Sequence, residues 1–254
     1  MGDRAGNCAV QNSDLVLSIG NRLSIRQVGY NWKTWAREAY VIMNDVDEAE
    51  LKKPTLHVDM PVWGDAKELL SKMEKVLGGM EKSGQLAGGK LFQNEEWVKT
   101  CQNWKEKYPV VLPKHYEDKD HANVYAFIKE LSRRLDEGQV TVVGNGSACV
   151  VGSHGYEIKK DQRFIINSAI ASMGYDLPAA IGAAVAEFGD EALNGRSLGK
   201  KVKDIILVTG DGSIQMNIQE LQTIIHHRMP IKIFIINNQG YHSMRQTEGN
   251  LFPE

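Results

Sequence analysis

Two short polar segments, each directly behind an apolar run, carry residue types suited to binding a metal ion and a phosphate. The first is GDGS at 210–213, which follows DIILVT, and the second is NNQGY at 237–241, which follows IKIFII. The chain between them is long enough for one helix and one returning strand. In an open sheet of parallel strands, this connection brings both segments to the carboxyl edge, where ligands bind. We therefore expect the two segments to form one site.

These segments supply oxygen atoms of three kinds. Asp211 offers a carboxylate, Asn238 an amide oxygen and Gly240 a backbone carbonyl. Mg2+ prefers an octahedron of oxygens and commonly completes it with water and phosphate oxygens. The N–H groups of Gly212 and Ser213 lead into a helix, whose start favours an anion. The sequence therefore predicts a site for Mg2+ and a diphosphate, with Asp211, Asn238 and Gly240 as metal ligands.

A plainer interpretation of each segment exists. Glycine, aspartate and asparagine are common in turns for local reasons, so either segment taken alone is more often a simple turn. Both segments follow an apolar run, and their separation suits a strand–helix–strand unit. The pair therefore favours a binding site over two unrelated turns.

The elements that must position this site alternate along the second half of the chain. Apolar runs predict strands there, and amphipathic stretches predict helices. In chain order these are helix 120–135, strands 139–144 and 163–168, helix 174–188, strand 203–210, helix 217–228 and strand 231–237, with a polar excursion at 189–203. This alternation predicts an α/β fold, in which a parallel sheet carries helices on both faces.

The first half of the chain shows a shorter pattern of the same kind. The apolar runs 14–19 and 39–44 predict buried strands, and the apolar spacing of 65–77 predicts a helix. A glycine-rich stretch and a charged helix at about 94–107 follow. We therefore expect three parts, namely a domain at 1–80, a linker with one helix at 81–118, and the domain with the site at 119–254.

Composition narrows the classes of partner. Lys and Arg total 30 against 32 Asp and Glu, so no overall positive field attracts nucleic acid or anionic lipid. No stretch approaches the roughly 18 to 20 apolar residues that a membrane span needs. Three widely separated cysteines fit a reducing compartment. We expect a cytoplasmic protein with neither nucleic acid nor a membrane as partner.

The pattern of GDG followed by NN about two dozen residues later resembles the signature of thiamine diphosphate-dependent 2-oxo acid enzymes, and among them the acetolactate synthase-like large subunits. Residues 166–182, INSAIASMGYDLPAAIG, resemble the family's strand, loop and helix that hold the thiamine rings. Residues 12–22 and 62–66 resemble the second half of its Rossmann-like central domain. The resemblance covers nearly the whole chain but begins inside one family domain and ends inside the next. It implies a fragment with a partial thiamine diphosphate-binding fold.

The resemblance also implies roles for single residues. Met173 stands where the family has a bulky apolar residue that wedges between the two cofactor rings, and the carbonyl of Ala171 stands where one accepts a hydrogen bond from the aminopyrimidine. Asn145 and Gly146 are expected to contact the diphosphate. Tyr241, at the end of the second segment, joins the same cofactor-binding set.

Simpler interpretations of these residues stay open. Methionine is commonly a core filler, and Met173 taken alone would be one. Residues 143–147 suit a simple turn almost as well as a diphosphate loop. His154 and Tyr156 could line the pocket, although a surface position is favoured for both.

In this family the cofactor acts as an electron sink for decarboxylation or carboligation of 2-oxo acids. The family's activating glutamate lies in an N-terminal domain and normally reaches the site from a second subunit, which implies a homodimer or homotetramer. Glu220 and Glu248 lie in the wrong segments to replace it. We expect the isolated chain to have essentially no turnover, and the sequence assigns no catalytic residue of its own.

Two departures from the family pattern bear on the reaction. Thr247 stands where acetolactate synthases carry a tryptophan that selects the acceptor, so the choice between decarboxylase and carboligase stays open. Residues 20–26, GNRLSIR, lack the acidic pair of the flavin-using members, so FAD is not expected.

The alternative from another class is a non-catalytic α/β module that binds a Mg2+–diphosphate or a nucleotide. The absence of a Walker or GxGxxG-type motif argues against it.

Overall fold

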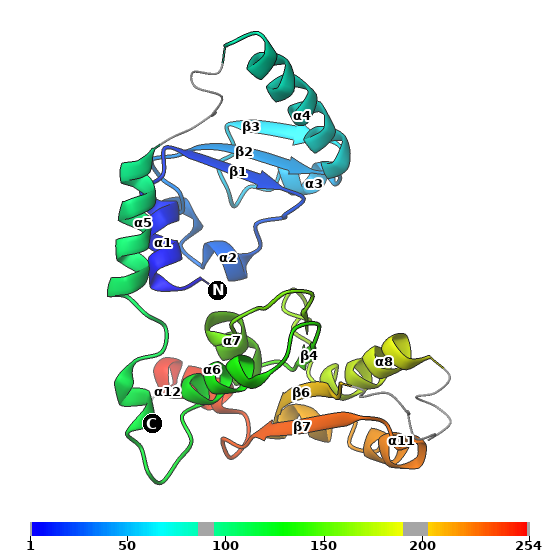
Figure 1. The fold of residues 1–254 in the computed structure, drawn as a ribbon. Coiled ribbons are helices and arrows are strands. Elements are labelled where there is room, and N and C mark those ends of the chain that lie inside the picture. Colours follow the sequence, from blue (N-terminus) through cyan, green and yellow to red (C-terminus); the bar gives the residue numbers. More distant parts are fainter. Residues whose placement is uncertain (1, 86–93, 190–202, 253–254) are drawn as a thin grey trace. The chain divides into compact units, whose positions relative to one another are not determined.

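The computed structural model describes residues 2–85, 94–189 and 203–252. It divides into two compact units, residues 1–109 and residues 110–254, each of which is described by itself. Both contain a parallel sheet with helices beside it, as Figure 1 shows, so the predicted α/β class is confirmed. Among the described residues, no helix is long and apolar enough to cross a membrane.

The first unit is built on a three-stranded parallel sheet in the order β1-β2-β3. Its strands are β1 (Leu15–Ile19), β2 (Tyr40–Asp45) and β3 (Met60–Trp63). Its helices are α1 (Arg4–Asn12), α2 (Ile25–Val28), α3 (Glu48–Leu51), α4 (Ala66–Lys82) and α5 (Glu95–Lys107), with a 3-10 turn η1 (Trp32–Thr34). The sequence predicted β1, β2, α4 and α5, whereas α1 and β3 were not expected.

One expectation about this unit was wrong. β1 was predicted to be buried, yet Leu15 and Leu17 are exposed and only Ser18 of this strand is buried. β1 is an edge strand that pairs with β2 alone, so it has neighbours on one side only. The small core of the unit lies instead around Met43, in the central strand β2.

Helix α5, which was expected inside a linker, belongs to the first unit. It packs against α1, and the Arg4 guanidinium lies 4.3 Å from the centre of the Tyr108 ring just beyond it. The boundary between the units therefore falls after residue 109, rather than after 80 or 118. Residues 86–93 of the expected linker lie outside the described residues.

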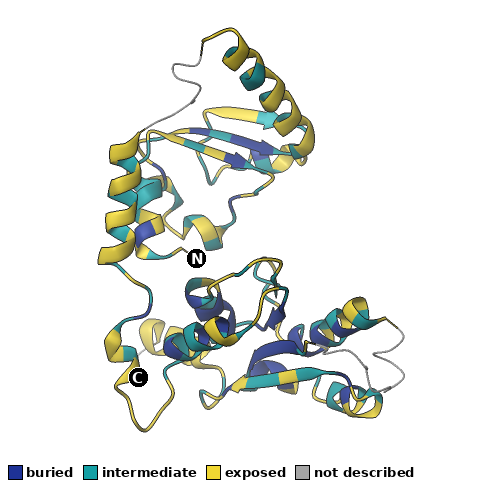
Figure 2. Ribbon diagram, in the orientation of Figure 1, coloured by how far each residue is buried: buried dark blue, intermediate teal, exposed yellow. Residues whose placement is uncertain are grey.

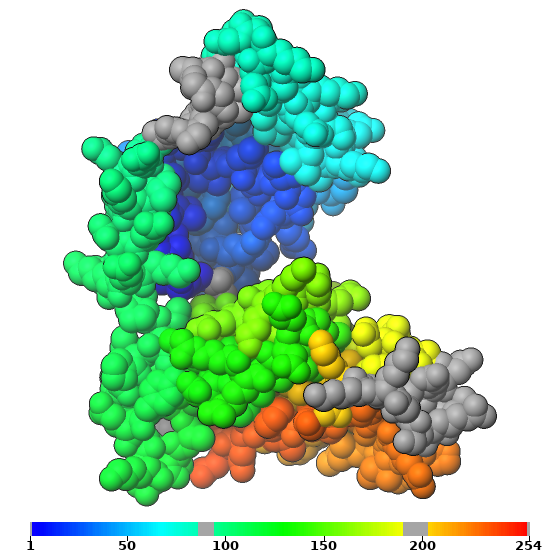
Figure 3. Space-filling model, in the orientation of Figure 1, coloured from blue at the N-terminus to red at the C-terminus, as the bar shows by residue number. Residues whose placement is uncertain are grey.

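The second unit holds a four-stranded parallel sheet in the order β5-β4-β6-β7. Its strands are β4 (Val140–Val143), β5 (Arg163–Ile166), β6 (Ile205–Gly210) and β7 (Ile231–Ile236). Its helices are α6 (Val124–Arg134), α7 (Ser147–Gly155), α8 (Asp176–Phe188), α10 (Asp211–Gln215), α11 (Glu220–His227) and α12 (His242–Leu251), with a 3-10 turn η3 (Pro113–Tyr116). All four predicted strands are present, and β7 (orange) forms one edge of the sheet at the surface of the unit (Figure 3).

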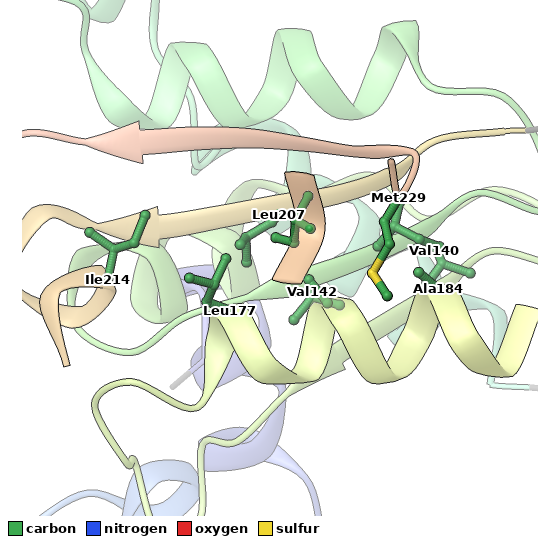
Figure 4. Packing of buried hydrophobic residues seen from close by; sticks show 10 residues of the cluster. Val140, Val142, Leu177, Ala184, Leu207, Ile214 and Met229 are labelled. Carbon is green, nitrogen blue, oxygen red and sulfur yellow. The ribbon is translucent and has the colours of Figure 1, made fainter. Parts of the chain in front are cut away.

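Both faces of this sheet are covered, which explains the continuous apolar runs. Every residue of β4 is buried, and so are the first five of β6 (Figure 2). On one face, Val142 and Leu207 pack against Leu177 and Ala184 of α8 (Figure 4). On the other face, the strands pack against α6 and α7.

Two details of the second unit differ from expectation. The predicted helix 217–228 is present as α11 at Glu220–His227, and a separate short helix, α10, begins at Asp211 directly after β6. Tyr156, favoured as a surface residue, is half-buried and packs against the core instead. Its ring centre lies 4.9 Å from that of Phe164, and its hydroxyl shares a 2.9 Å hydrogen bond with the Thr141 hydroxyl. The excursion at 189–203 lies outside the described residues except at its two ends.

Candidate cofactor and metal site

Three segments meet at the carboxyl edge of the second sheet. They follow β4, β6 and β7, which end at Val143, Gly210 and Ile236. Gly210 pairs with Ile236 in the ladder, and the N–H of Gly144 donates to the Val208 carbonyl at 2.8 Å. The polar residues that follow each strand are therefore neighbours, as the parallel arrangement requires.

A cavity of about 150 Å3 lies between these segments. It is lined by Asn145, Gly146, Ser147, Met173, Gly210, Asp211, Gly212, Ser213, Asn238, Tyr241, His242, Ser243 and Met244. The predicted cofactor residues are all among them except Ala171 and Gly240. Those two are bonded to lining residues, Ala171 to Asn145 and Gly240 to Asp211.

The Asp211 carboxylate joins the two segments that the sequence paired. Its Oδ2 accepts hydrogen bonds from the N–H groups of Asn238 at 3.1 Å and Gly240 at 2.8 Å. Its Oδ1 accepts from the Gly212 N–H at 2.8 Å. A carboxylate has about four lone-pair positions, so Asp211 keeps room for a cation.

The Asn238 side chain provides the test of whether a cation fits here. Its Oδ1 is buried and has no hydrogen-bond partner among the described residues, while its Nδ2 lies 3.4 Å from the Ser147 hydroxyl. A buried amide oxygen without a partner is unfavourable by about 1–3 kcal/mol. An oxygen-seeking cation beside Asp211 would satisfy it.

No group of three or more His, Cys, Asp or Glu side chains that could hold a metal occurs within the described residues. The candidate site depends on one carboxylate with amide and carbonyl oxygens, a donor set that suits Mg2+ rather than Zn2+.

Gly240, the third predicted ligand, lies in a tight segment. Gln239, Gly240 and Tyr241 have φ angles of 62°, 79° and 47°, in the left-handed region. The Gly240 carbonyl accepts a hydrogen bond from Arg245, which the sequence did not predict. Two of the three expected ligands are therefore open to a cation, and the third is engaged by a guanidinium.

The residues expected around the cofactor rings lie at the same edge. Asn145 Nδ2 donates to the Ala171 carbonyl at 2.6 Å, and Ala171 has a φ of 61°. Met173 lines the cavity and keeps 37% of its surface exposed. Its Cε lies 3.5 Å from the point where a Cβ on Gly212 would stand. Met173 is therefore not a core filler.

Residues 145–147 form a tight turn and also line the cavity. Gly146 has a φ of 72° and precedes α7, whose first turn begins at Ser147. Glycine adopts this conformation without the penalty that a Cβ brings. Residues 145–147 therefore form a turn and line the cavity at the same time.

Asp176 is a buried residue of this region that sequence reasoning missed. It is fully buried, and the hydroxyls of Thr209 and Ser213 both donate to its carboxylate, the latter at 3.2 Å. Ser213 Oγ in turn accepts from the Gly174 N–H at 2.9 Å. A Cβ added to Gly144 would clash with the same carboxylate. Asp176 therefore ties the loop that carries Met173 to the start of α10.

Family comparisons agree with this division of the chain. A family described as "Thiamine pyrophosphate enzyme, C-terminal TPP binding domain" matches residues 144–253, and "Thiamine pyrophosphate enzyme, central domain" matches residues 1–73.

Similar proteins are acetolactate synthase large subunits. That of Cyanidium caldarium is 33% identical, over 100% of this chain and 39% of its own length. The chloroplastic acetolactate synthase of Arabidopsis thaliana is 31% identical, over 97% of this chain and 33% of its own. The isozyme 2 large subunit of Escherichia coli K12 is 28% identical, over 100% and 40%. The chain thus spans about two fifths or less of the length of these relatives. It belongs to the thiamine pyrophosphate enzymes, matches their central and C-terminal TPP-binding domains, and is acetolactate synthase-like.

Proposed function

We propose that the second unit holds the Mg2+ and diphosphate half of a thiamine diphosphate site that serves decarboxylation or carboligation of 2-oxo acids. The observation that carries this proposal is the buried Asn238 Oδ1, which has no hydrogen-bond partner within the described residues, while the Asn238 N–H donates to the Asp211 carboxylate. In this proposal Asp211, Asn238 and the Gly240 carbonyl bind Mg2+. The donor set and the position at the sheet edge both support it.

Backbone groups around the cavity would hold the diphosphate. The N–H group of Ser213 lies in the first turn of α10, and those of Gly146 and Ser147 begin α7. The Gly212 N–H, which donates to Asp211 Oδ1 in this structure, would turn to the diphosphate once Asp211 binds the cation. The Asn145 side chain adds an amide donor. Helix starts attract anions because their N–H groups have no partner within the helix.

The remaining residues would orient the rings. Met173 faces the cavity from the 166–176 loop, and Tyr241 faces it from the segment after β7. The Ala171 carbonyl would accept from the aminopyrimidine once Asn145 has turned to the diphosphate. When bound, thiamine diphosphate supplies the electron sink for the reaction, and the protein supplies orientation and electrostatics.

We infer that this chain needs a second contributor for turnover. Within the described part of the chain, Asp211 is the only carboxylate that lines the cavity. Because Asp211 would bind the metal in this proposal, no carboxyl group of the cavity is left to protonate the aminopyrimidine ring. The acid would come from another domain or subunit, which makes a homodimer or homotetramer the expected assembly. The purified chain should decarboxylate no 2-oxo acid measurably.

The proposal leaves the acceptor open. Thr247 lies exposed on α12, where its hydroxyl donates to the Ser243 carbonyl at 3.0 Å. A threonine offers a smaller surface than the tryptophan of acetolactate synthases, so both a simple decarboxylase and a carboligase with another acceptor stay open. FAD binding is not expected, and a cytoplasmic location stays a prediction.

Calorimetric titration with thiamine diphosphate tests the proposal. We expect binding only in the presence of Mg2+, and loss of that binding in Asp211→Ala. Asp136→Ala is the matched control, because it removes an exposed carboxylate just before β4, at the opposite edge of the sheet. Binding that ignores Mg2+, or that survives in Asp211→Ala, would contradict the proposal. Competition with ADP distinguishes a thiamine diphosphate site from a nucleotide-binding module. ADP should displace thiamine diphosphate only if the chain is a nucleotide-binding module.

A further inference from the structure

The Arg245 side chain contacts the segment that is proposed to bind the metal. Arg245 lies near the start of α12, and its guanidinium reaches back over residues 238–240. It donates to the carbonyls of Gln239 at 2.7 Å and of Asn238 at 2.8 Å, and also to that of Gly240. A cation therefore already lies at the carbonyl that the metal would need.

The segment is held from two sides by opposite charges. The Asp211 carboxylate accepts from the N–H groups of Asn238 and Gly240, while the guanidinium binds the carbonyls of the same stretch. Left-handed backbone in non-glycine residues such as Gln239 persists only where surrounding contacts hold it. Arg245 supplies three of those contacts from the carbonyl side.

We propose that Arg245 takes the place of the metal at the Gly240 carbonyl in the metal-free chain, so that Mg2+ binds fully only after the guanidinium has left. This inference rests on the proposed Mg2+ site. A guanidinium and Mg2+ both seek oxygen, and two cations on one carbonyl repel each other. Arg245 is exposed, so water can solvate it after release. Arg245 thus opposes metal loading, and loading frees α12 from residues 238–240.

Mg2+ titration at saturating thiamine diphosphate, followed by calorimetry, tests this role. Arg245→Gln removes the competing charge and should tighten Mg2+ binding about threefold to tenfold, the range for an exposed charge-assisted contact. Arg163→Gln is the matched control, because it removes the same charge at the amino end of β5, away from the site. Arg163→Gln should bind Mg2+ with an affinity within about twofold of the wild-type value. A difference of that size is too small to assign to the loss of one contact.

The outcomes separate this inference from the proposal beneath it. Unchanged or weaker Mg2+ binding in Arg245→Gln overturns the inference, because Arg245 would then be neutral or would help to form the site. Absence of Mg2+ binding in both the wild type and Arg245→Gln instead overturns the proposed function. Should Arg245→Gln fail to fold, Arg245→Met decides. Its unbranched side chain brings no charge to the carbonyls, so Mg2+ must still bind more tightly than to the wild type.

Discussion

Substitution of Asp176 should destabilise the second unit and leave the first unit unchanged. In Asp176→Ala, the hydroxyls of Thr209 and Ser213 lose a fully buried acceptor. Each hydrogen bond to a charged group contributes about 1.5–3 kcal/mol. Thr209 can turn to the Gly210 carbonyl, 3.3 Å away, which recovers part of one bond. We therefore expect a loss of about 2–4 kcal/mol in the free energy of unfolding of this unit.

The chain contains an internal control for this measurement. All five tryptophans lie between residues 32 and 104, within the first unit. Urea unfolding followed by tryptophan fluorescence therefore reports on the first unit, and far-ultraviolet circular dichroism reports on both. In Asp176→Ala the circular dichroism transition of the second unit should move to lower urea, while the fluorescence midpoint stays in place.

Asp176→Asn is the conservative comparison, because an amide oxygen can still accept from one hydroxyl. It should lose about half as much stability as the alanine variant. A change below about 0.5 kcal/mol in Asp176→Ala, the size of an ordinary surface substitution, would refute the reasoning that this carboxylate holds the two loops together.

Three further predictions follow from single contacts. Gly146→Ala puts a Cβ on a residue with a φ of 72° and should weaken Mg2+-dependent thiamine diphosphate binding about fivefold or more in calorimetry, so an unchanged affinity would contradict the diphosphate role. Asn145→Asp replaces the donor to the Ala171 carbonyl with a second negative charge near the diphosphate, and it should abolish binding that Asn145→Ala only weakens. The N–H of Val41 lowers the pKa of Asp59 below 3.8, so Asp59 stabilises the first unit above that pH, and this stability falls as the pH drops through the lowered value. In Asp59→Asn, the tryptophan-monitored midpoint should depend less on pH in that acidic range than it does in the wild type.

The parts of the fold that the sequence predicted are those in which burial decides conformation. β4 and β6 are apolar throughout because both of their faces are covered, and such runs are recognisable without partners. β3 was missed because it contains Pro61, which argues against a central strand and is tolerated at a sheet edge. α7 was missed because its sequence SACVVGSHG has glycine and β-branched residues that disfavour helices. Tertiary packing therefore determines the elements that local pattern does not.

The same distinction holds at the candidate site. Asp211 and Asn238 could be paired from the sequence because parallel strands end at a common edge, a rule that needs no side-chain detail. The family to which these segments belong was predicted from the same residues and is confirmed. Asp176 and Arg245 were not foreseen, because their partners depend on how a buried loop and a terminal helix fold back. Those contacts are specific to the three-dimensional structure.

The central claim is that Asp211 and Asn238 hold a divalent cation together with a diphosphate, and electron paramagnetic resonance of Mn2+ as a stand-in for Mg2+ tests it most directly. In the presence of thiamine diphosphate, Mn2+ should change from the spectrum of a freely tumbling ion to that of an immobilised ion when the chain is added. The Asn238→Ala variant should produce a much smaller change. Two results would contradict the account: a Mn2+ spectrum that does not change when the chain is added, or a change that is as large with Asn238→Ala as with the wild type.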